Sequence, residues 1–183
     1  METYIALLRG INVSGQKKIK MADLKVMFED LGCISVTTYI QSGNVVFQYK
    51  SIDTKKISVL ITKGILTHFG FDVPVLVLTH RALVSIYENN PFLEQLKTKM
   101  IEDKKMYFTL LFNEPDSTTV AEFANISYDN ETIISTSEVV YLYAGNGYGK
   151  TKLTTVFFEK KLNVMATTRN LKTMHKLIEL SKL

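Results

Sequence analysis

Apolar and polar positions alternate in the first eighty residues with the spacings of strands and helices. Residues 21–31 and 57–69 carry apolar side chains three and four positions apart, which predicts two helices that end at Gly32 and Gly70. Ser51 or Asp53 is a suitable cap for the second helix. The predicted strands are short β-rich runs at residues 4–8, 36–41, 45–49 and 73–78. The order of elements is therefore βαββαβ.

The second half of the chain repeats this order. Its predicted strands lie at residues 106–112, 132–135, 139–143 and 164–166. Helices are predicted after the capping sequence 114–117, through residue 124, and around residues 153–157 behind a glycine-rich loop. A final helix carries Leu171, Met174, Leu177 and Ile178 on one face, with Asn170 as its N-cap.

Two βαββαβ units predict an α+β fold of two tandem ferredoxin-like halves, each with a four-stranded antiparallel sheet. We place the first half at residues 1–80, a helical connector at 81–104, and the second half with its C-terminal helix at 105–183. With right-handed crossovers, loop 9–20 lies beside turn 41–44 in the first half. In the second half, residues 144–152 lie beside 166–170.

Composition narrows the class of protein. The 183 residues contain 22 basic and 18 acidic side chains, one cysteine and 46% hydrophobic residues, which is typical of a globular protein. No run is apolar and long enough to span a membrane, and Cys33 alone forms no internal disulfide. These features favour the cytoplasm and exclude a membrane partner.

Charge is distributed unevenly along the chain. Residues 1–25 carry a net charge of +3 and residues 149–183 a net charge of +6, whereas residues 81–148 carry −5. Two basic ends around an acidic middle favour an anionic ligand if they share a face. The alternative is that these charges only solvate helix surfaces.

The first candidate site combines loop 9–20 with the turn that follows residue 40. Arg9 could bind a carboxylate or phosphate through its forked guanidinium, while Gly10 and Gly15 let backbone amides approach the ligand. The amide and hydroxyl groups beside Arg9 suit a ligand rich in polar atoms. They belong to Asn12, Gln41, Ser42 and Asn44. The alternative is structural, because Ser-Gly-Asn is also a good turn sequence and Arg9 could donate hydrogen bonds to backbone carbonyls of the hairpin.

The second candidate site contains Lys150 and Arg169. Residues 144–151 fit a relaxed phosphate-loop pattern, with alanine for the first glycine, between a predicted strand and a predicted helix. An antiparallel sheet and the lack of a later strand ending in aspartate argue against a nucleotide hydrolase and leave simple anion binding or a structural turn. Arg169 precedes the helix cap Asn170, where a cation is disfavoured unless an anion lies between them.

Conventional catalytic groups are scarce in the sequence. His68, His80 and His175 have no motif that ties them to a nucleophile or a metal, and Cys33 follows a helix end in an apolar setting. No Cys/His grouping has the spacing of zinc ligands, so neither a metal nor a cofactor is predicted. Whether the protein is an enzyme stays open.

The motifs in these loops resemble those of the bacterial domain of unknown function 1697 family. The resemblance rests on residues 7–15 (LLRGINVSG), 39–47 (YIQSGNVVF), 90–92 (NPF), 147–153 (GYGKTKL) and 166–170 (ATTRN). It implies neither an activity nor catalytic residues. Ser14 stands where a second glycine is common, and Leu171 where the family often has tryptophan, so a stacking surface is lost.

Three functions fit these observations. The first is binding of a small anionic or phosphate-bearing ligand at the polar loops. The second is nucleic-acid binding by a ferredoxin-like sheet with basic ends, for which Phe47 and Tyr49 supply alternate aromatics without the flanking motif of RNA-recognition sheets. The third is a scaffold or homo-oligomer that binds protein through exposed sheet faces.

Overall fold

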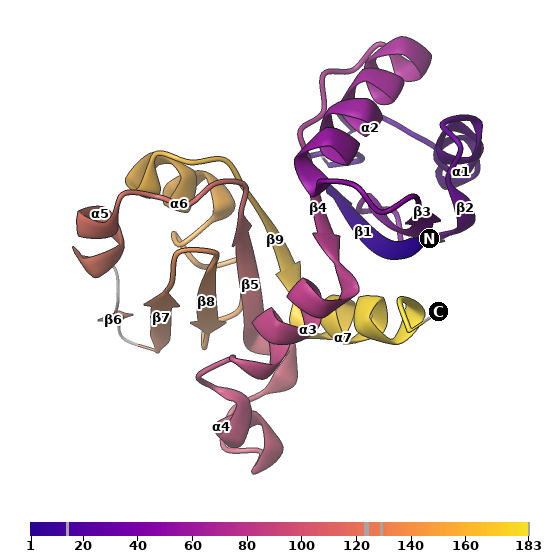
Figure 1. Cartoon of the computed structure of the whole chain (residues 1–183). Coiled ribbons are helices and arrows are strands. Elements are labelled where there is room, and N and C mark those ends of the chain that lie inside the picture. The colour runs from indigo at the N-terminus through magenta and orange to yellow at the C-terminus, as the bar shows by residue number, and fades with distance from the viewer. Residues whose placement is uncertain (14, 123–124, 129, 183) are drawn as a thin grey trace. The chain divides into compact units, whose positions relative to one another are not determined.

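The computed structural model describes residues 1–13, 15–122, 125–128 and 130–182 of an α+β protein (Figure 1). The chain divides into two units. The first unit comprises Met1–Val84 and Lys176–Leu183, and the second comprises Ser85–His175. The chain passes from one unit to the other within helix α3 (His80–Glu88) and within helix α7 (Leu171–Leu180).

The first unit contains a four-stranded antiparallel sheet in the order β2-β3-β1-β4. Two helices cover one face of this sheet, as Figure 1 shows. The elements are β1 (Glu2–Leu8), α1 (Met21–Asp30), β2 (Ile34–Tyr39), β3 (Asn44–Tyr49), α2 (Thr54–Phe69) and β4 (Val75–Thr79). The predicted strand and helix order of this half is confirmed.

The helix ends follow the predicted capping chemistry. Asp53 is the N-cap of α2, where its Oδ1 accepts a hydrogen bond from the Lys55 backbone N–H at 2.7 Å. Gly70 ends the same helix with φ of +70°, a conformation that costs glycine little. The turn after α1 contains Gly32 with φ of +85°. Local sequence signals therefore determine where these helices start and stop.

The core of the first unit lies between the sheet and the two helices. Phe47 of β3 is fully buried; its ring stacks on Tyr4 at 5.9 Å between centroids and meets Phe28 of α1 edge-on at 5.2 Å. Strand residues Ala6 and Val45 lie in the same apolar cluster. Alternate positions of β1 and β3 thus supply the helix-facing side of the core.

The second unit contains a five-stranded antiparallel sheet in the order β6-β7-β8-β5-β9. Before the sheet come α4 (Leu93–Lys97) and a 3₁₀ turn at Asp103–Lys105. The remaining elements are β5 (Met106–Leu111), α5 (Ser117–Glu122), β6 (Asn125–Tyr128), β7 (Glu131–Ser135), β8 (Val139–Ala144), α6 (Thr155–Leu162) and β9 (Ala166–Asn170). Residues 123 and 124, predicted to end a helix, lie outside the described residues.

The second sheet corrects three sequence predictions. The sheet has a fifth strand, β6, because four residues after α5 pair with β7 in a run too short to give a clear strand pattern. Strand β9 begins at Ala166 and runs to Asn170, so the segment 166–170 is a paired edge strand rather than a loop. Helix α6 begins at Thr155, because Thr154 is its N-cap and accepts from the Phe157 N–H at 3.3 Å.

The second unit has its own apolar cluster between the sheet and α6. Phe158 and Leu162 of α6 pack on Ile133, Leu142 and Ala166 of the strands. Leu153, predicted on the helix, is buried in this cluster although it lies in the loop before α6. No described helix is long and apolar enough to cross a membrane.

The Phe47→Ala substitution tests the core of the first unit. We expect it to lower the free energy of unfolding by about 3 to 5 kcal/mol, because it removes a buried ring and leaves a cavity. Urea unfolding measures this loss. The control is Val59→Ala on α2, whose side chain is 54% exposed and whose loss we expect to stay within about 0.5 kcal/mol. Equal effects of the two substitutions would contradict this description of the core.

Candidate functional site

Asn12 joins the loop after β1 to the turn between β2 and β3. Its Nδ2 donates to the carbonyl oxygens of Ile19 and Gln41, each at 2.9 Å, and its Oδ1 accepts from the Ile19 backbone N–H at 2.9 Å. The Leu8 N–H also donates to the Gly43 carbonyl at 2.8 Å. These contacts confirm that loop 9–20 lies beside turn 41–44. We call residues 9–20 and 40–44 the Asn12 loops.

Left-handed backbone gathers in the Asn12 loops. Six of the twelve described residues with positive φ belong to them: Gly10 (+73°), Asn12 (+54°), Gly15 (+76°), Lys17 (+42°), Ile40 (+48°) and Gly43 (+69°). For a branched residue such as Ile40 this conformation is strained by roughly 1 to 2 kcal/mol. The contacts around the turn must hold it in place. Strain of this kind is often found at binding sites.

Gly43 is required by a close approach as well as by its backbone angle. A Cβ atom at this position would lie 2.6 Å from the Leu8 Cβ and 2.9 Å from the Ile11 Cδ1. Any side chain would therefore push the turn away from β1. The glycine predicted to shape a turn also lets the two Asn12 loops touch.

The predicted site residues of the first unit have different surroundings. Asn44 is fully buried and donates from Nδ2 to the Tyr39 carbonyl at 3.0 Å, so it closes the β2–β3 turn. Gln41 and Ser42 are exposed, and Arg9 is half-buried. The Arg9 backbone N–H donates to the Pro74 carbonyl at 2.9 Å, which anchors the start of the loop to the segment before β4.

Three lysines belong to the first of the Asn12 loops. Lys18 and Lys20 are exposed, and the Nζ of half-buried Lys17 contacts the Asp72 carbonyl oxygen. With Arg9 they place four cationic side chains within twelve residues of sequence. A small anion at these loops would meet a favourable potential.

The glycine-rich loop of the second unit is used for turns. The backbone N–H groups of Gly145, Gly147 and Lys150 donate to the carbonyls of Asn130, Ala144 and Gly147 at 2.9, 2.7 and 3.0 Å. A Cβ on Gly145 would lie 2.1 Å from the Asn130 carbonyl oxygen, so close packing alone requires this glycine. The loop also does not lead directly into a helix, because α6 begins at Thr155. The prediction that residues 144–151 open a helix, as in a phosphate loop, is wrong.

Lys150 and Arg169 differ in exposure. Lys150 is exposed, whereas Arg169 is 8% exposed, and burial lowers the pKa of its guanidinium to about 10. Its Nη1 donates to the Thr167 Oγ1 at 2.8 Å and to the Thr168 carbonyl at 2.9 Å. Arg169 therefore lies along its own strand and stays protonated at neutral pH. Among the described contacts, none joins it to Lys150.

Asn170 has the predicted capping role. Its Oδ1 accepts from the Thr173 N–H at 2.9 Å in the first turn of α7. The neighbouring Thr168 Oγ1 shares hydrogen bonds with Thr109 at 2.9 Å and Thr155 at 2.7 Å. Strand β9 thus alternates between the α6 side, where Thr168 lies, and the opposite side, where Arg169 lies.

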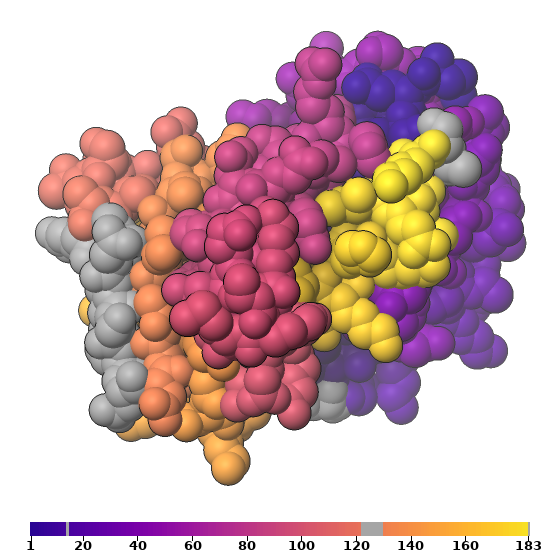
Figure 2. Space-filling model, turned by 90° about the horizontal axis from the view of Figure 1, so that it is seen from below, coloured from indigo at the N-terminus to yellow at the C-terminus, as the bar shows by residue number. Residues whose placement is uncertain are grey.

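No predicted site residue lines either of two open depressions formed by described residues. One, of about 510 Å³, lies in the second unit between the α4 segment and β7–β8, where Figure 2 shows the two segments side by side. Phe92, Gln95, Lys105, Asn130 and Tyr143 are among its lining residues. The other, in the first unit, includes His80, Arg81 and Lys182. Spacing along the chain does not predict that residues about a hundred positions apart meet there.

The titratable groups in the described part of the chain do not form a conventional active site. Burial raises the pKa of the Cys33 thiol to about 12, so Cys33 is the inert residue that was predicted. The Nδ1 of His68 lies 2.9 Å from the Gly64 carbonyl, one turn earlier in α2. In the part of the chain that the structure describes, no three His, Cys, Asp or Glu residues lie together as metal ligands would.

The aromatic residues that favoured nucleic-acid binding lie on the covered side of the sheet. Phe47 is fully buried against α1, and Tyr49 packs against the same apolar cluster. RNA-recognition sheets instead stack bases on aromatic rings of their open face. This pair therefore gives no support to the second function.

Two substitutions distinguish the contribution of the Asn12 hydrogen bonds from that of its backbone conformation. Asn12→Gly removes three hydrogen bonds but tolerates the positive φ, and we expect it to cost about 2 to 3 kcal/mol in the free energy of unfolding. Asn12→Ala should cost about 1 kcal/mol more, because alanine is strained there. Chemical unfolding measures both losses. Values below 0.5 kcal/mol for both variants would show that Asn12 does not hold the loops.

Comparisons with known proteins agree with this fold and leave the activity open. No curated protein matches the chain. The structure of the conserved bacterial protein SP0830 from Streptococcus pneumoniae is similar over 99% of both chains, with a TM-score of 0.75 and 22% identity, which shows a shared fold. A family described as protein of unknown function, DUF1697, matches residues 1–141. Since that match takes in the Asn12 loops and most of the chain, the protein belongs to the DUF1697 family.

Proposed function

We propose that the protein binds a small anionic or phosphate-bearing ligand at the Asn12 loops. The observation that carries this proposal is the left-handed backbone concentrated in these loops and held by the Asn12 carboxamide. Loops fixed before the ligand arrives lose little conformational entropy on binding. A structural turn alone has no need for strain at Ile40.

Charge supports an anionic ligand. The residues of the first unit include twelve basic and seven acidic side chains, a net charge of +5, whereas those of the second unit include ten and eleven, a net charge of −1. The excess positive charge of the chain therefore belongs to the unit that contains the Asn12 loops. Attraction of this kind speeds the encounter with an anion and weakens as salt rises.

The site residues divide into two roles in this proposal. Arg9, Gln41 and Ser42 contact the ligand, through a guanidinium fork, a carboxamide and a hydroxyl. Asn12 and Asn44 are positioning residues, because the contacts of Asn12 and the burial of Asn44 place them inside the loops. That Lys150 and Arg169 contact a ligand stays a prediction.

We also propose that the two units arose by duplication of one ferredoxin-like βαββαβ element. Without β6, the sheet order β7-β8-β5-β9 repeats the order β2-β3-β1-β4. In chain order, each unit then has one helix between its first and second strands and another between its third and fourth strands.

We place the binding of the ligand in the cytoplasm, where a single cysteine stays reduced.

Thermal unfolding with a panel of inorganic phosphate, pyrophosphate, nucleotides and sugar phosphates tests the proposed function. A ligand present at a hundred times its Kd should raise the stability by roughly 2.7 kcal/mol. The double variant Lys18→Gln/Lys20→Gln should weaken binding roughly tenfold, or about 1.4 kcal/mol, because it removes two charges from the first of these loops.

The matched control is Lys55→Gln/Lys63→Gln, which removes the same charge from exposed positions on α2. We expect this control to keep its affinity within about twofold, since screening limits the reach of distant charges. The proposal would be overturned if no compound of the panel stabilises the protein, or if both double variants lose affinity equally. Stabilisation by RNA alone would favour the nucleic-acid alternative.

A further inference from the structure

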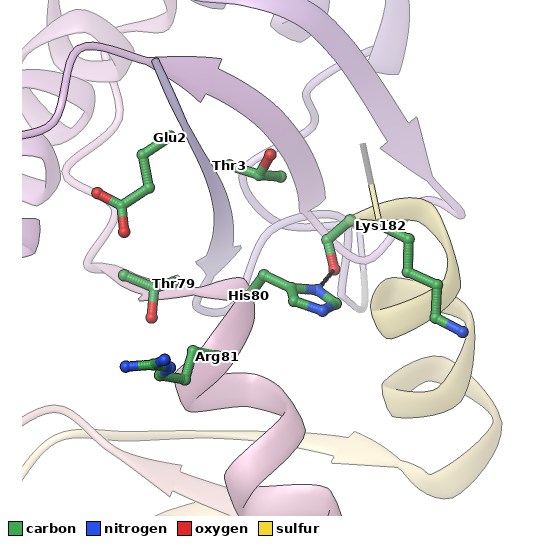
Figure 3. A pocket seen from close by; sticks show the side chains of 7 residues that line it. Glu2, Thr3, Thr79, His80, Arg81 and Lys182 are labelled. Carbon is green, nitrogen blue, oxygen red and sulfur yellow. Dashed lines mark hydrogen bonds between the residues drawn. The ribbon is translucent and has the colours of Figure 1, made fainter.

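An open depression of about 430 Å³ lies at the junction of β4 and α3 in the first unit (Figure 3). Its lining comes from three parts of the chain: the start of β1, this junction, and the residues after α7. The lining residues are Glu2, Thr3, Thr79, His80, Arg81, Ser181 and Lys182. None of them belongs to the Asn12 loops.

The junction between β4 and α3 is held by strand pairing and by a hydrogen bond to the first turn of the helix. Thr79 pairs with Tyr4 at the end of β4, and its Oγ1 accepts from the Ala82 N–H at 3.1 Å in the first turn of α3. His80 and Arg81 follow at once, so both lie at the rim of the depression. Figure 3 shows the His80 ring turned toward the end of α7 and Arg81 on the other side of the junction.

The His80 ring is oriented by Ser181. Its Nδ1 lies 2.8 Å from the Ser181 Oγ, and the Ser181 hydroxyl donates to the Ile178 carbonyl at 3.2 Å. A hydroxyl has one proton, so it donates either to the carbonyl or to the imidazole; when it donates to the His80 Nδ1, the proton of the neutral ring is on Nε2. The Nε2 atom lies on the edge of the ring away from Ser181.

Ser181 is not a nucleophile activated by this histidine. It is 2% exposed, so a substrate has little access to its hydroxyl oxygen. The pair is better suited to fixing the ring than to acyl transfer. A fixed imidazole that presents Nε2–H as a donor suits an anion.

The charges around the depression favour an anion as well. Arg81 and Lys182 are exposed cationic side chains. The carboxylate that shares the depression, Glu2, has its Oε2 engaged by the hydroxyls of Tyr4 at 2.8 Å and Ser51 at 3.0 Å. Thr3 and Thr79 add hydroxyl groups to the lining.

We propose that this depression is a second anion site, which binds the phosphate group of a small phosphate monoester. Arg81 and Lys182 supply the charge, His80 supplies a donor from a ring held by Ser181, and the open mouth leaves room for the rest of the ester. The inference is independent of the proposed function, because the two sites share no residue.

Inorganic phosphate is the probe, and the Cε1–H resonances of His68, His80 and His175 in the full chain are the readout. Titration at constant ionic strength and pH should shift the His80 resonance along a saturable curve, with smaller effects at the other two histidines. Acetate at the same ionic strength should give less than a third of that shift, because it has one charge. A linear shift, or equal shifts at all three histidines, would mean an adventitious ion only and would overturn the proposal.

Single variants identify the groups that bind the phosphate. Arg81→Gln and Lys182→Gln should each raise the phosphate Kd at least fivefold, while Lys63→Gln, with the same loss of charge on α2, should leave it unchanged. Unchanged His68 and His175 resonances in each variant show that it is folded. An unchanged Kd in both rim variants would overturn the assignment.

A last variant separates this site from the Asn12 loops. Lys18→Gln/Lys20→Gln should leave the His80 titration as it is in the wild type, since neither lysine lines the depression. A loss of the His80 response in this double variant would show that the response comes from the Asn12 loops, and the second site would be withdrawn.

Discussion

The carboxamide of Asn12 determines the geometry of the polar end of the first sheet. One side chain bonds Ile19 within its own loop and Gln41 across the turn, so two segments 29 residues apart are held in one arrangement. Around it, the Leu8–Gly43 hydrogen bond and the missing side chain of Gly43 bring the turn against β1. The strained backbone of Ile40 is acceptable only because these contacts fix the turn.

The core beneath these loops makes this arrangement possible. Strand β1 lies in the middle of its sheet between β3 and β4, and its alternate side chains pack with Phe47 and Phe28 under the helices. A central strand held on both sides gives the loop after it a fixed starting point. The polar contacts then position backbone and exposed groups on a rigid base, which is the arrangement a binding site needs.

Much of this structure was predictable from local signals. Asp53 and Gly70 defined α2, and the order of strands and helices in the first unit followed from apolar spacing. The juxtaposition of the two Asn12 loops followed from the topology alone. Strand β6 was not predictable because four residues carry too little pattern. Strand β9 was predicted too early, at residues 164–166, because the polar residues that follow Ala166 lack the apolar alternation of a strand.

The roles of individual polar residues were harder to predict than the fold. Asn12 and Arg9 both look like ligand contacts in the sequence, yet only the structure shows that the amide of Asn12 is used within the loops. The glycines of residues 145–149 resemble a phosphate loop, but at Gly145 the neighbour is the carbonyl of Asn130. Hydrogen-bond partners distant in sequence decide such cases, and spacing does not encode them.

Hydrogen exchange at the Ile19 amide tests the central claim most directly. This N–H donates to the Asn12 Oδ1, so in the wild type we expect exchange at least roughly a hundredfold slower than in Asn12→Gly, provided that it occurs by local opening. The Gly70 amide, which donates to the Leu66 carbonyl at the end of α2, serves as the internal reference and should be unaffected. Equal exchange of Ile19 in both proteins would show that Asn12 does not hold the loops.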